Sequence, residues 1–241
     1  MKIKKPLCRI ALFSVVASLV MLGGCFGNNS KTPSSSVGSE SAPEEMLLSA
    51  KHIYQLDKWP TGCESVSAVM ALESAGVNVT VDDFIDNYLN CTSRPFDPEK
   101  SFGGDPRSQS GKGCYAPVIK AALDKALEGT GLAARQLKGL TVKELCEKYI
   151  ANGTPVIFWG TLDMAEPFEG DSWEFEGKKI TWIRPEHCLL LVGYNADSYI
   201  FCDPMREEDV TYYPKAAVET AYKALYSQAV VIEKTASDAA K

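Results

Sequence analysis

A cysteine that opens an apolar helical pattern is the residue best placed for covalent chemistry. Cys63 follows the turn-type segment 59–62, and apolar residues recur at helical spacing from Val66 to Leu72. The unpaired N–H groups at a helix N-terminus favour a thiolate over a thiol, and the thiolate is the nucleophilic form of cysteine. Most cysteines are inert core residues, so this prediction depends on a base beside Cys63. The neighbouring Glu64 is ordinarily expected to be a solvated carboxylate, and the alternative is that it tunes the charge beside the nucleophile.

A histidine and an aspartate at neighbouring strand ends supply that base. His187 precedes an apolar strand pattern, and Asp203 follows the next one. The turn-type residues between them predict a hairpin centred near Asn195, in which opposed residues have an index sum of about 390. In this register His187 lies beside Asp203, whose carboxylate would orient the imidazole. The chain has only two histidines, so His187 is the predicted base and His52 has no assigned chemistry. Glu186, like the acid beside Cys63, is expected to be solvated.

The elements that must position these residues fall into two groups along the chain. Helices are predicted over 63–75, 80–89, 115–128, 141–152 and 214–225, and strands over 155–159, 179–183, 188–194, 198–202 and 229–232. Between them lie a long loop at 91–113 and a rim or lid at 168–177. Helices first and a mostly antiparallel sheet second predict an α+β domain, with the nucleophile on the helical part and His187 and Asp203 on the sheet.

The first 45 residues have the pattern of an export signal followed by a tether. Basic residues precede an apolar run at 10–22, which as a helix would span about 20 Å and is too short for a membrane-spanning anchor. The following Leu22-Gly-Gly-Cys25 resembles the lipobox of bacterial lipoproteins, which implies removal of residues 1–24 and a lipid on Cys25. Plain secretion, with Cys25 incidental, is the alternative. Residues 25–45 are rich in Ser, Pro and Gly and predict a flexible linker, so the folded domain is expected at 46–241.

Composition excludes several classes of function. Removal of residues 1–24 takes away four positive charges and no acid, so the net charge falls from −6 to −10, which argues against a basic nucleic-acid-binding face. Two histidines and the lack of any Cys-x-x-Cys pair leave no pattern for a zinc site. We therefore expect no metal, no cofactor and no nucleic-acid partner, while the oligomeric state stays open.

Four motifs in the same order give the chain a family resemblance. The chain resembles papain-like cysteine peptidases of the C39-like group at Gln55, Thr61-Gly-Cys63-Glu-Ser65, His187-Cys-Leu-Leu-Leu-Val-Gly-Tyr194 and Asp203-Pro204, and the likeness covers most of residues 50–233. The resemblance implies a papain-like fold in which Cys63 is the nucleophile, His187 the base and then the acid, and Asp203 the orienting group. Gln55 resembles the side-chain donor of the oxyanion hole, with the Cys63 backbone N–H as the natural second donor.

The resemblance also implies an activity, and together with the lipobox it implies a location in the cell. The expected function is a cysteine peptidase or amide hydrolase that acts on a peptide or protein substrate and is anchored by lipid on the outer side of the cell membrane. The bacteriocin-processing members of the group work in the cytoplasm, fused to transporters, so their substrate does not carry over. Two alternatives stay open: a catalytically silent lipoprotein that binds peptide or cell-wall ligands, and a transacylase that uses the same thiol and imidazole.

The other cysteines leave the disulfide pattern open. Cys188 and Cys202 share the index sum of about 390 and are expected to be neighbours, either as free core thiols or as a cross-strand disulfide. Cys91 and Cys114 bracket the long loop, and a disulfide between them would staple it. If Cys63 is free, at least one further thiol must be unpaired within a monomer.

Overall fold

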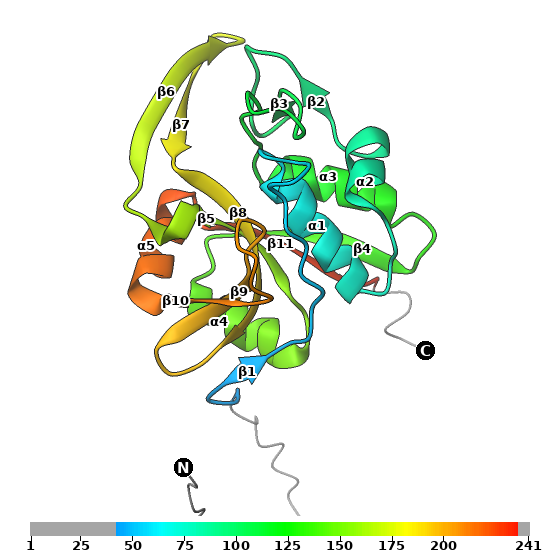
Figure 1. Cartoon of the computed structure of the whole chain (residues 1–241), viewed down its shortest axis with the longest axis vertical. Coiled ribbons are helices and arrows are strands. Elements are labelled where there is room, and N and C mark those ends of the chain that lie inside the picture. The colour runs from blue at the N-terminus through cyan, green and yellow to red at the C-terminus, as the bar shows by residue number, and fades with distance from the viewer. Residues whose placement is uncertain (1–41, 236–241) are drawn as a thin grey trace, which may run out of the picture. The chain divides into compact units, whose positions relative to one another are not determined.

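A seven-stranded antiparallel sheet forms the centre of the described chain, which comprises residues 42–235 of this computed structural model (Figure 1). The strand order is β10-β9-β8-β5-β11-β4, and β1 pairs with the end of β8. The strands are β1 (Met46–Leu47), β4 (Leu132–Lys138), β5 (Val156–Thr161), β8 (Glu186–Tyr194), β9 (Ser198–Cys202), β10 (Thr211–Pro214) and β11 (Gln228–Lys234). Two small sheets lie outside it, β2 (Cys91–Thr92) with β3 (Phe102–Gly103) and β6 (Phe168–Phe175) with β7 (Lys178–Arg184).

Helices cover both faces of the large sheet and confirm the predicted α+β class (Figure 1). The helices are α1 (Cys63–Ser74), α2 (Val81–Asn87), α3 (Ala116–Ala126), α4 (Val142–Lys148) and α5 (Lys215–Ala224), with short 3-10 turns η1 (Ile150–Asn152) and η2 (Leu162–Met164). Trp159 and Leu190 pack in the core with α1–α3, whereas their neighbours Phe158 and Leu191 pack in the core with α4 and α5. Because successive strand residues point to opposite faces and both faces are covered, the central strands are apolar throughout.

Local sequence signals predicted the helix ends correctly to within a few residues. The helix that begins at Cys63 ends before Gly76, whose φ of +81° lies in the left-handed region that glycine tolerates. Thr80 accepts the Asp83 N–H through its side chain at 3.1 Å, so α2 begins at the predicted cap. Thr141 forms a complete capping box at the start of α4. These contacts lie within one helical turn, which is why the sequence reveals them.

The structure contains strands that the sequence did not predict. β4 has the sequence Leu-Ala-Ala-Arg-Gln-Leu-Lys, which contains no β-branched or aromatic residue, yet all seven of its residues pair with β11. Long-range pairing therefore overrides local preference here. The expected rim at 168–177 is the strand β6 and its turn, which forms a hairpin with β7 that extends away from the large sheet (Figure 1).

The predicted register of the hairpin between β8 and β9 was wrong by two to three residues. Leu190 opposes Cys202, whereas Cys188 opposes Trp159 on the other neighbouring strand, β5. The turn is displaced toward the C-terminus because the Asn195 side chain accepts the N–H groups of residues 197 and 198 at 3.0 and 2.8 Å, and a bulge follows in the ladder. Cys188 and Cys202 are therefore not cross-strand partners.

Both candidate disulfides are absent from the described residues. Cys188 and Cys202 carry free, buried thiols that pack in the core with α1–α3. Cys91 and Cys114 are also free, and the first is exposed while the second is buried. The long loop is held by other contacts, among them a hydrogen bond from Thr61 and an ion pair of Arg107.

Several predictions concern residues that the structure does not describe. The signal peptide at 1–24, the lipid on Cys25 and nearly all of the linker at 25–45 lie outside residues 42–235. They stay predictions from the sequence. Among the described residues, no helix is both long enough and apolar enough to cross a membrane.

Candidate active site

Cys63 is the first residue of α1, directly after a tight turn, and this helix packs on the large sheet. Gly62 precedes the helix, and a Cβ on it would lie 2.9 Å from the Cβ of Trp59, so this turn requires a glycine. The helix packs on β8, where the Ser67 hydroxyl donates to the main-chain oxygen of Cys188 at 3.2 Å. The nucleophile candidate is therefore fixed next to the strand that carries His187.

His187 and Asp203 form a buried hydrogen-bonded pair. The Nε2 atom of His187 lies 2.7 Å from Oδ1 of Asp203, and the two residues are 2% and 0% exposed. Asp203 also accepts the Tyr213 hydroxyl at 2.6 Å and the Met205 N–H at 2.9 Å. The structure thus brings together the predicted base and orienting group, and leaves Nδ1 as the other ring nitrogen of His187.

The surroundings of Asp203 keep its carboxyl ionised. Burial alone would raise the pKa of this group, but the hydrogen bond and charge of His187 oppose that effect, as do the hydrogen bonds from Tyr213 and Met205. Together they lower the pKa of Asp203 to about 2. His52, which had no assigned chemistry, contacts the main chain of Asp203, with its Nε2 2.9 Å from the Asp203 carbonyl oxygen. It therefore helps to fix the segment that carries the carboxylate.

Gln55 lies between the turn before Cys63 and the segment after Asp203. Its side chain is 1% exposed and donates from Nε2 to the Pro60 carbonyl oxygen at 3.2 Å, while its backbone N–H donates to the Pro204 oxygen at 2.9 Å. The amide oxygen Oε1 is buried and has no hydrogen-bond partner among the described residues. A buried amide oxygen without a hydrogen-bond partner costs free energy of folding, unless a ligand or a reacting group supplies a donor to it.

One cleft brings these side chains together. Its volume is about 340 Å³. It is lined by Gln55, Pro60, Thr61, Cys63, Gln109, Gly111, Lys112, Leu162, Trp182, Arg184, Pro185, Glu186, His187 and Met205. Asp203 does not line the cleft, because it lies behind His187. A thiol, an imidazole backed by a carboxylate, and an amide donor around one cavity are the parts that acyl transfer through a covalent thioester requires.

Glu64 is buried beside Cys63, so the expectation of a solvated carboxylate was wrong for this residue, whereas Glu186 is half-buried at the wall of the cleft. Glu64 is fully buried and accepts the Cys114 N–H at 2.6 Å through Oε1 and the Cys63 thiol at 3.3 Å through Oε2. An oxygen of each carboxyl and the Cys63 sulfur all lie within 4.8 Å of one another. Within residues 42–235 this is the one group of thiol, imidazole and carboxyl side chains close enough to share a metal ion. Glu64 already uses both oxygens as hydrogen-bond acceptors.

The ionisation of Cys63 is also opposite to the expectation. Burial raises the pKa of the Cys63 thiol well above its ordinary value, and the nearby Glu64 and Glu186 raise it further. The helix N-terminus favours a thiolate, but removal of water and two neighbouring carboxyl groups outweigh it. Cys63 is therefore a thiol in this state of the protein, and a thiolate requires transfer of its proton to a base.

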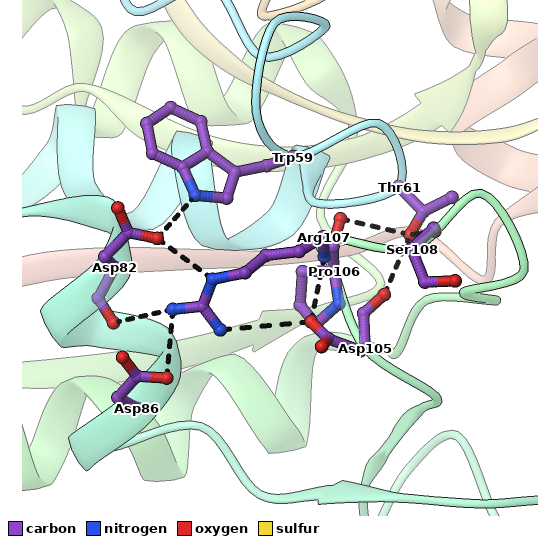
Figure 2. A network of polar contacts seen from close by, with 8 residues as sticks. All are labelled: Trp59, Thr61, Asp82, Asp86, Asp105, Pro106, Arg107 and Ser108. Atoms are coloured by element: carbon purple, nitrogen blue, oxygen red, sulfur yellow. Dashed lines mark hydrogen bonds and ion pairs between the residues drawn. The ribbon is translucent and has the colours of Figure 1, made fainter.

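The loop at 105–111 is tied to the turn before Cys63 by a polar network (Figure 2). Arg107 donates from Nε to Asp82 at 3.0 Å and from Nη2 to Asp86 at 2.9 Å, both on α2. Thr61 donates to main-chain oxygens of the loop, of which Ser108 is the nearest at 2.9 Å. Since Thr61 and Gly111 line the cleft, this network fixes one of its walls.

Replacing Arg107 with alanine tests that network. We expect a loss of about 1 kcal/mol in the free energy of unfolding, because the ion pairs are partly exposed but share one guanidinium. We also expect alkylation of Cys63 to become a few-fold faster as the wall loosens. Urea unfolding and timed iodoacetamide labelling measure the two effects. The control is Lys143→Ala, which removes an exposed ion pair on α4, and equal results for both variants would contradict the expectation.

The hairpin of β6 and β7 lines the cleft through Trp182 and Arg184 and is bound to the long loop. Trp173 stacks on Phe96 with ring centroids 5.1 Å apart and donates from Nε1 to the Phe96 oxygen at 2.6 Å. Asp171 accepts from Arg94 and Lys112 at 3.2 and 3.0 Å. Figure 1 shows this hairpin reaching the segment of β2 and β3. The contacts hold together two segments that line the cleft, at Trp182 in the hairpin and at Lys112 in the loop.

Comparison with known proteins shows the family and the fold of the chain. The model of the peptidase C39-like family matches residues 47–230. The structure resembles that of a C39-like peptidase from Bacillus anthracis, with a TM-score of 0.71 and 25% identity over 80% of this chain and 99% of the other. A search of curated proteins found no significant match.

More distant structures show lower similarity. A double glycine motif protease from an AMS/PCAT transporter, in complex with the leader peptide, has a TM-score of 0.48 and 13% identity over 79% of this chain and 95% of the other. Xylellain, a cysteine protease from Xylella fastidiosa, has a TM-score of 0.39 and 13% identity over 86% and 91%. The family match spans most of the chain and all four site residues that the sequence singled out. The chain belongs to the peptidase C39-like family of cysteine peptidases.

Proposed function

We propose that this cysteine peptidase cleaves peptide bonds through Cys63 and His187, with Asp203 orienting the imidazole and Gln55 in the oxyanion hole. The observation that carries the proposal is the buried pair of His187 and Asp203 at the wall of the cleft that Cys63 also lines. Membership of the family supports peptide substrates. The proposal also places the enzyme on the outer side of a bacterial membrane, held by a lipid on Cys25, which rests on the lipobox-like Leu22-Gly-Gly-Cys25 alone.

The geometry suggests the following order of proton transfers. The Cys63 proton passes to Nδ1 of His187, whose Nε2 is held by Asp203. The sulfur attacks the acyl carbon, and the Cys63 backbone N–H and the Gln55 amide hold the developing oxyanion. His187 then protonates the leaving amine, so that a thioester remains. A water molecule, deprotonated by His187, hydrolyses the thioester and restores the thiol. Transfer of the acyl group to an amine in place of water would make the enzyme a transacylase.

The second candidate is a protein that keeps the fold and binds peptide or cell-wall ligands without turnover. The observation that favours it is the state of Cys63, which is a buried thiol hydrogen-bonded to Glu64. A silent site would keep that contact when ligand binds. A peptidase must break it to pass the proton to His187.

Incubation of the purified protein with a mixed peptide library separates these candidates. For a peptidase we expect new peptide termini in mass spectra, and loss of this activity after an epoxide inhibitor has modified Cys63. Products with amines joined at the new carboxyl end would identify a transacylase. Retained binding of library peptides without any cleavage would reject the peptidase.

Metabolic labelling with a radioactive fatty acid tests the lipid anchor. We expect the label to be incorporated into the unaltered protein and to be lost in Cys25→Ala.

A further inference from the structure

Two carboxyl groups that the proposed mechanism does not use lie against the Cys63 sulfur. Glu64 follows Cys63 in α1, and Glu186 precedes His187 at the start of β8. A Cβ at Gly113 would lie 2.6 Å from Oε1 of Glu64 and 3.1 Å from Oε2 of Glu186. The main chain at Gly113 therefore passes directly over both carboxyl groups, and it has room to do so because this residue has no side chain.

These two carboxyl groups cannot both be ionised at low cost. Burial raises the pKa of Glu186 well above its ordinary value, and the charge of Glu64 adds to the effect. Burial also raises the pKa of Glu64, while hydrogen bonds from its own N–H, the Cys114 N–H and the Cys63 thiol oppose the rise. Oε1 of Glu186 is buried without a partner among the described residues. Burial and the charge of Glu64 therefore disfavour a charge on Glu186.

Glu64 is the member of the pair that contacts the nucleophile. Its two oxygens join the Cys63 thiol to the main chain at Cys114, which lies fifty residues away in the sequence. We propose that Glu64 is a positioning residue that, with Glu186 beside it, holds Cys63 as a hydrogen-bonded thiol until substrate enters the cleft. The proposal deepens the peptidase function above, because it concerns the thiol to which that function assigns the attack.

Each element packed around Cys63 contributes a titratable group to this environment. They are Glu64 from α1, Glu186, His187 and Cys188 from β8, and Cys114 from the segment before α3, with Lys112 and Arg184 lining the same cleft. Lys112 is already paired with Asp171. Among these groups, the carboxyl groups of Glu64 and Glu186 disfavour a thiolate at Cys63.

The transfer of the thiol proton requires no group other than Cys63, Glu64 and His187. In the free enzyme the thiol proton lies between the Cys63 sulfur and Oε2 of Glu64. When substrate binds, the thiol turns toward His187 and its proton passes to Nδ1, and the hydrogen bond from the thiol to Glu64 is lost. The ionised Glu64 then favours the imidazolium of His187, because a positive charge on this ring and the negative charge of Glu64 stabilise each other. Glu64 therefore suppresses the free thiolate and supports the thiolate–imidazolium pair.

The test is the pH dependence of Cys63 alkylation by iodoacetamide, followed by mass spectrometry of the peptide that contains Cys63. For the unaltered protein we expect a midpoint above pH 9, since the charged form is suppressed. For Glu64→Gln we expect the midpoint to fall by about one pH unit and alkylation at pH 7 to become about tenfold faster. Glu186→Gln is expected to shift it in the same direction by less. Glu128→Gln, an exposed change of equal charge, is the matched control and is expected to leave the midpoint unchanged.

Several outcomes would overturn the proposal. They are a midpoint at or below about pH 7 in the unaltered protein, an unchanged or raised midpoint in Glu64→Gln, and a control shift as large as that of Glu64→Gln. If Glu64→Gln does not fold, Glu186→Gln and the unaltered protein still decide the matter. Alkylation requires no turnover, so a protein that shows the expected shifts but cleaves no peptide rejects the peptidase function and keeps this inference.

Discussion

Replacing Cys63 with alanine is expected to lower kcat/KM for peptide cleavage by about 10⁴-fold or more, because no other group can form the thioester. The fold is expected to survive. The change removes one sulfur atom and one hydrogen bond to Glu64 from a 7% exposed position, which costs about 1 kcal/mol of the free energy of unfolding. Initial rates on the best library peptide measure the first effect, and urea unfolding measures the second.

Cys91→Ala is the matched control for this experiment. Cys91 is an exposed free thiol at the start of the long loop and does not line the cleft, so its removal is expected to leave the rate within twofold. A Cys63→Ala protein that cleaves peptide within tenfold of the unaltered rate would show that another group carries the chemistry. A loss of activity together with a loss of the cooperative unfolding transition would mean that the variant had not folded, and Cys63→Ser would then replace it.

The sequence predicted the pairing of His187 with Asp203 through a register that was wrong. The index sum of about 390 would place the two residues opposite each other, whereas the observed pairs have Leu190 opposite Cys202. The contact forms because Asp203 lies just beyond β9, where the chain turns and the Met205 N–H donates to its carboxylate. The location of both residues at strand ends was therefore enough to predict that they pair, although the predicted strand register was wrong. The opposed position of Cys188 and Cys202, which depended on the ladder alone, was predicted wrongly, whereas the expectation that both are free core thiols is confirmed.

The burial of Glu64 beside Cys63 could not be predicted from nearby residues. Glu64 is buried because the segment at Cys114 closes over it and supplies an N–H donor, and that contact spans fifty residues. Charged side chains are rarely buried, so the sequence favours solvent for both glutamates. The same limit applies to β4, which is a strand only because β11 pairs with it. Helix caps and the first residue of α1 depend on contacts within one turn, and these were predicted well.

Replacing Asp203 with asparagine is expected to lower kcat for peptide cleavage by about 10²- to 10⁴-fold, with little change in the extent of Cys63 alkylation. The amide has almost the shape of the carboxylate, but it cannot favour the charged form of His187. It also places an N–H₂ group where the His187 ring or the Tyr213 hydroxyl now donates. Single-turnover and steady-state rates measure the loss. Tyr213→Phe, which removes one donor and keeps the carboxylate, is the control and is expected to retain more than a tenth of the activity.

The same variant is expected to lose the part of the stability that depends on an ionised Asp203. The pKa of this carboxyl is about 2 in the folded protein and 3.8 for an unperturbed aspartate, which corresponds to about 2 kcal/mol of the free energy of unfolding. A lowered pKa contributes stability that is fully present above pH 5 and is lost as the pH falls toward 2. Urea unfolding of both proteins between these limits should therefore give a stability difference that shrinks with acid. A difference that stays constant over this range would mean that the Asp203 charge contributes nothing to folding, and the carboxylate would then serve the imidazole alone.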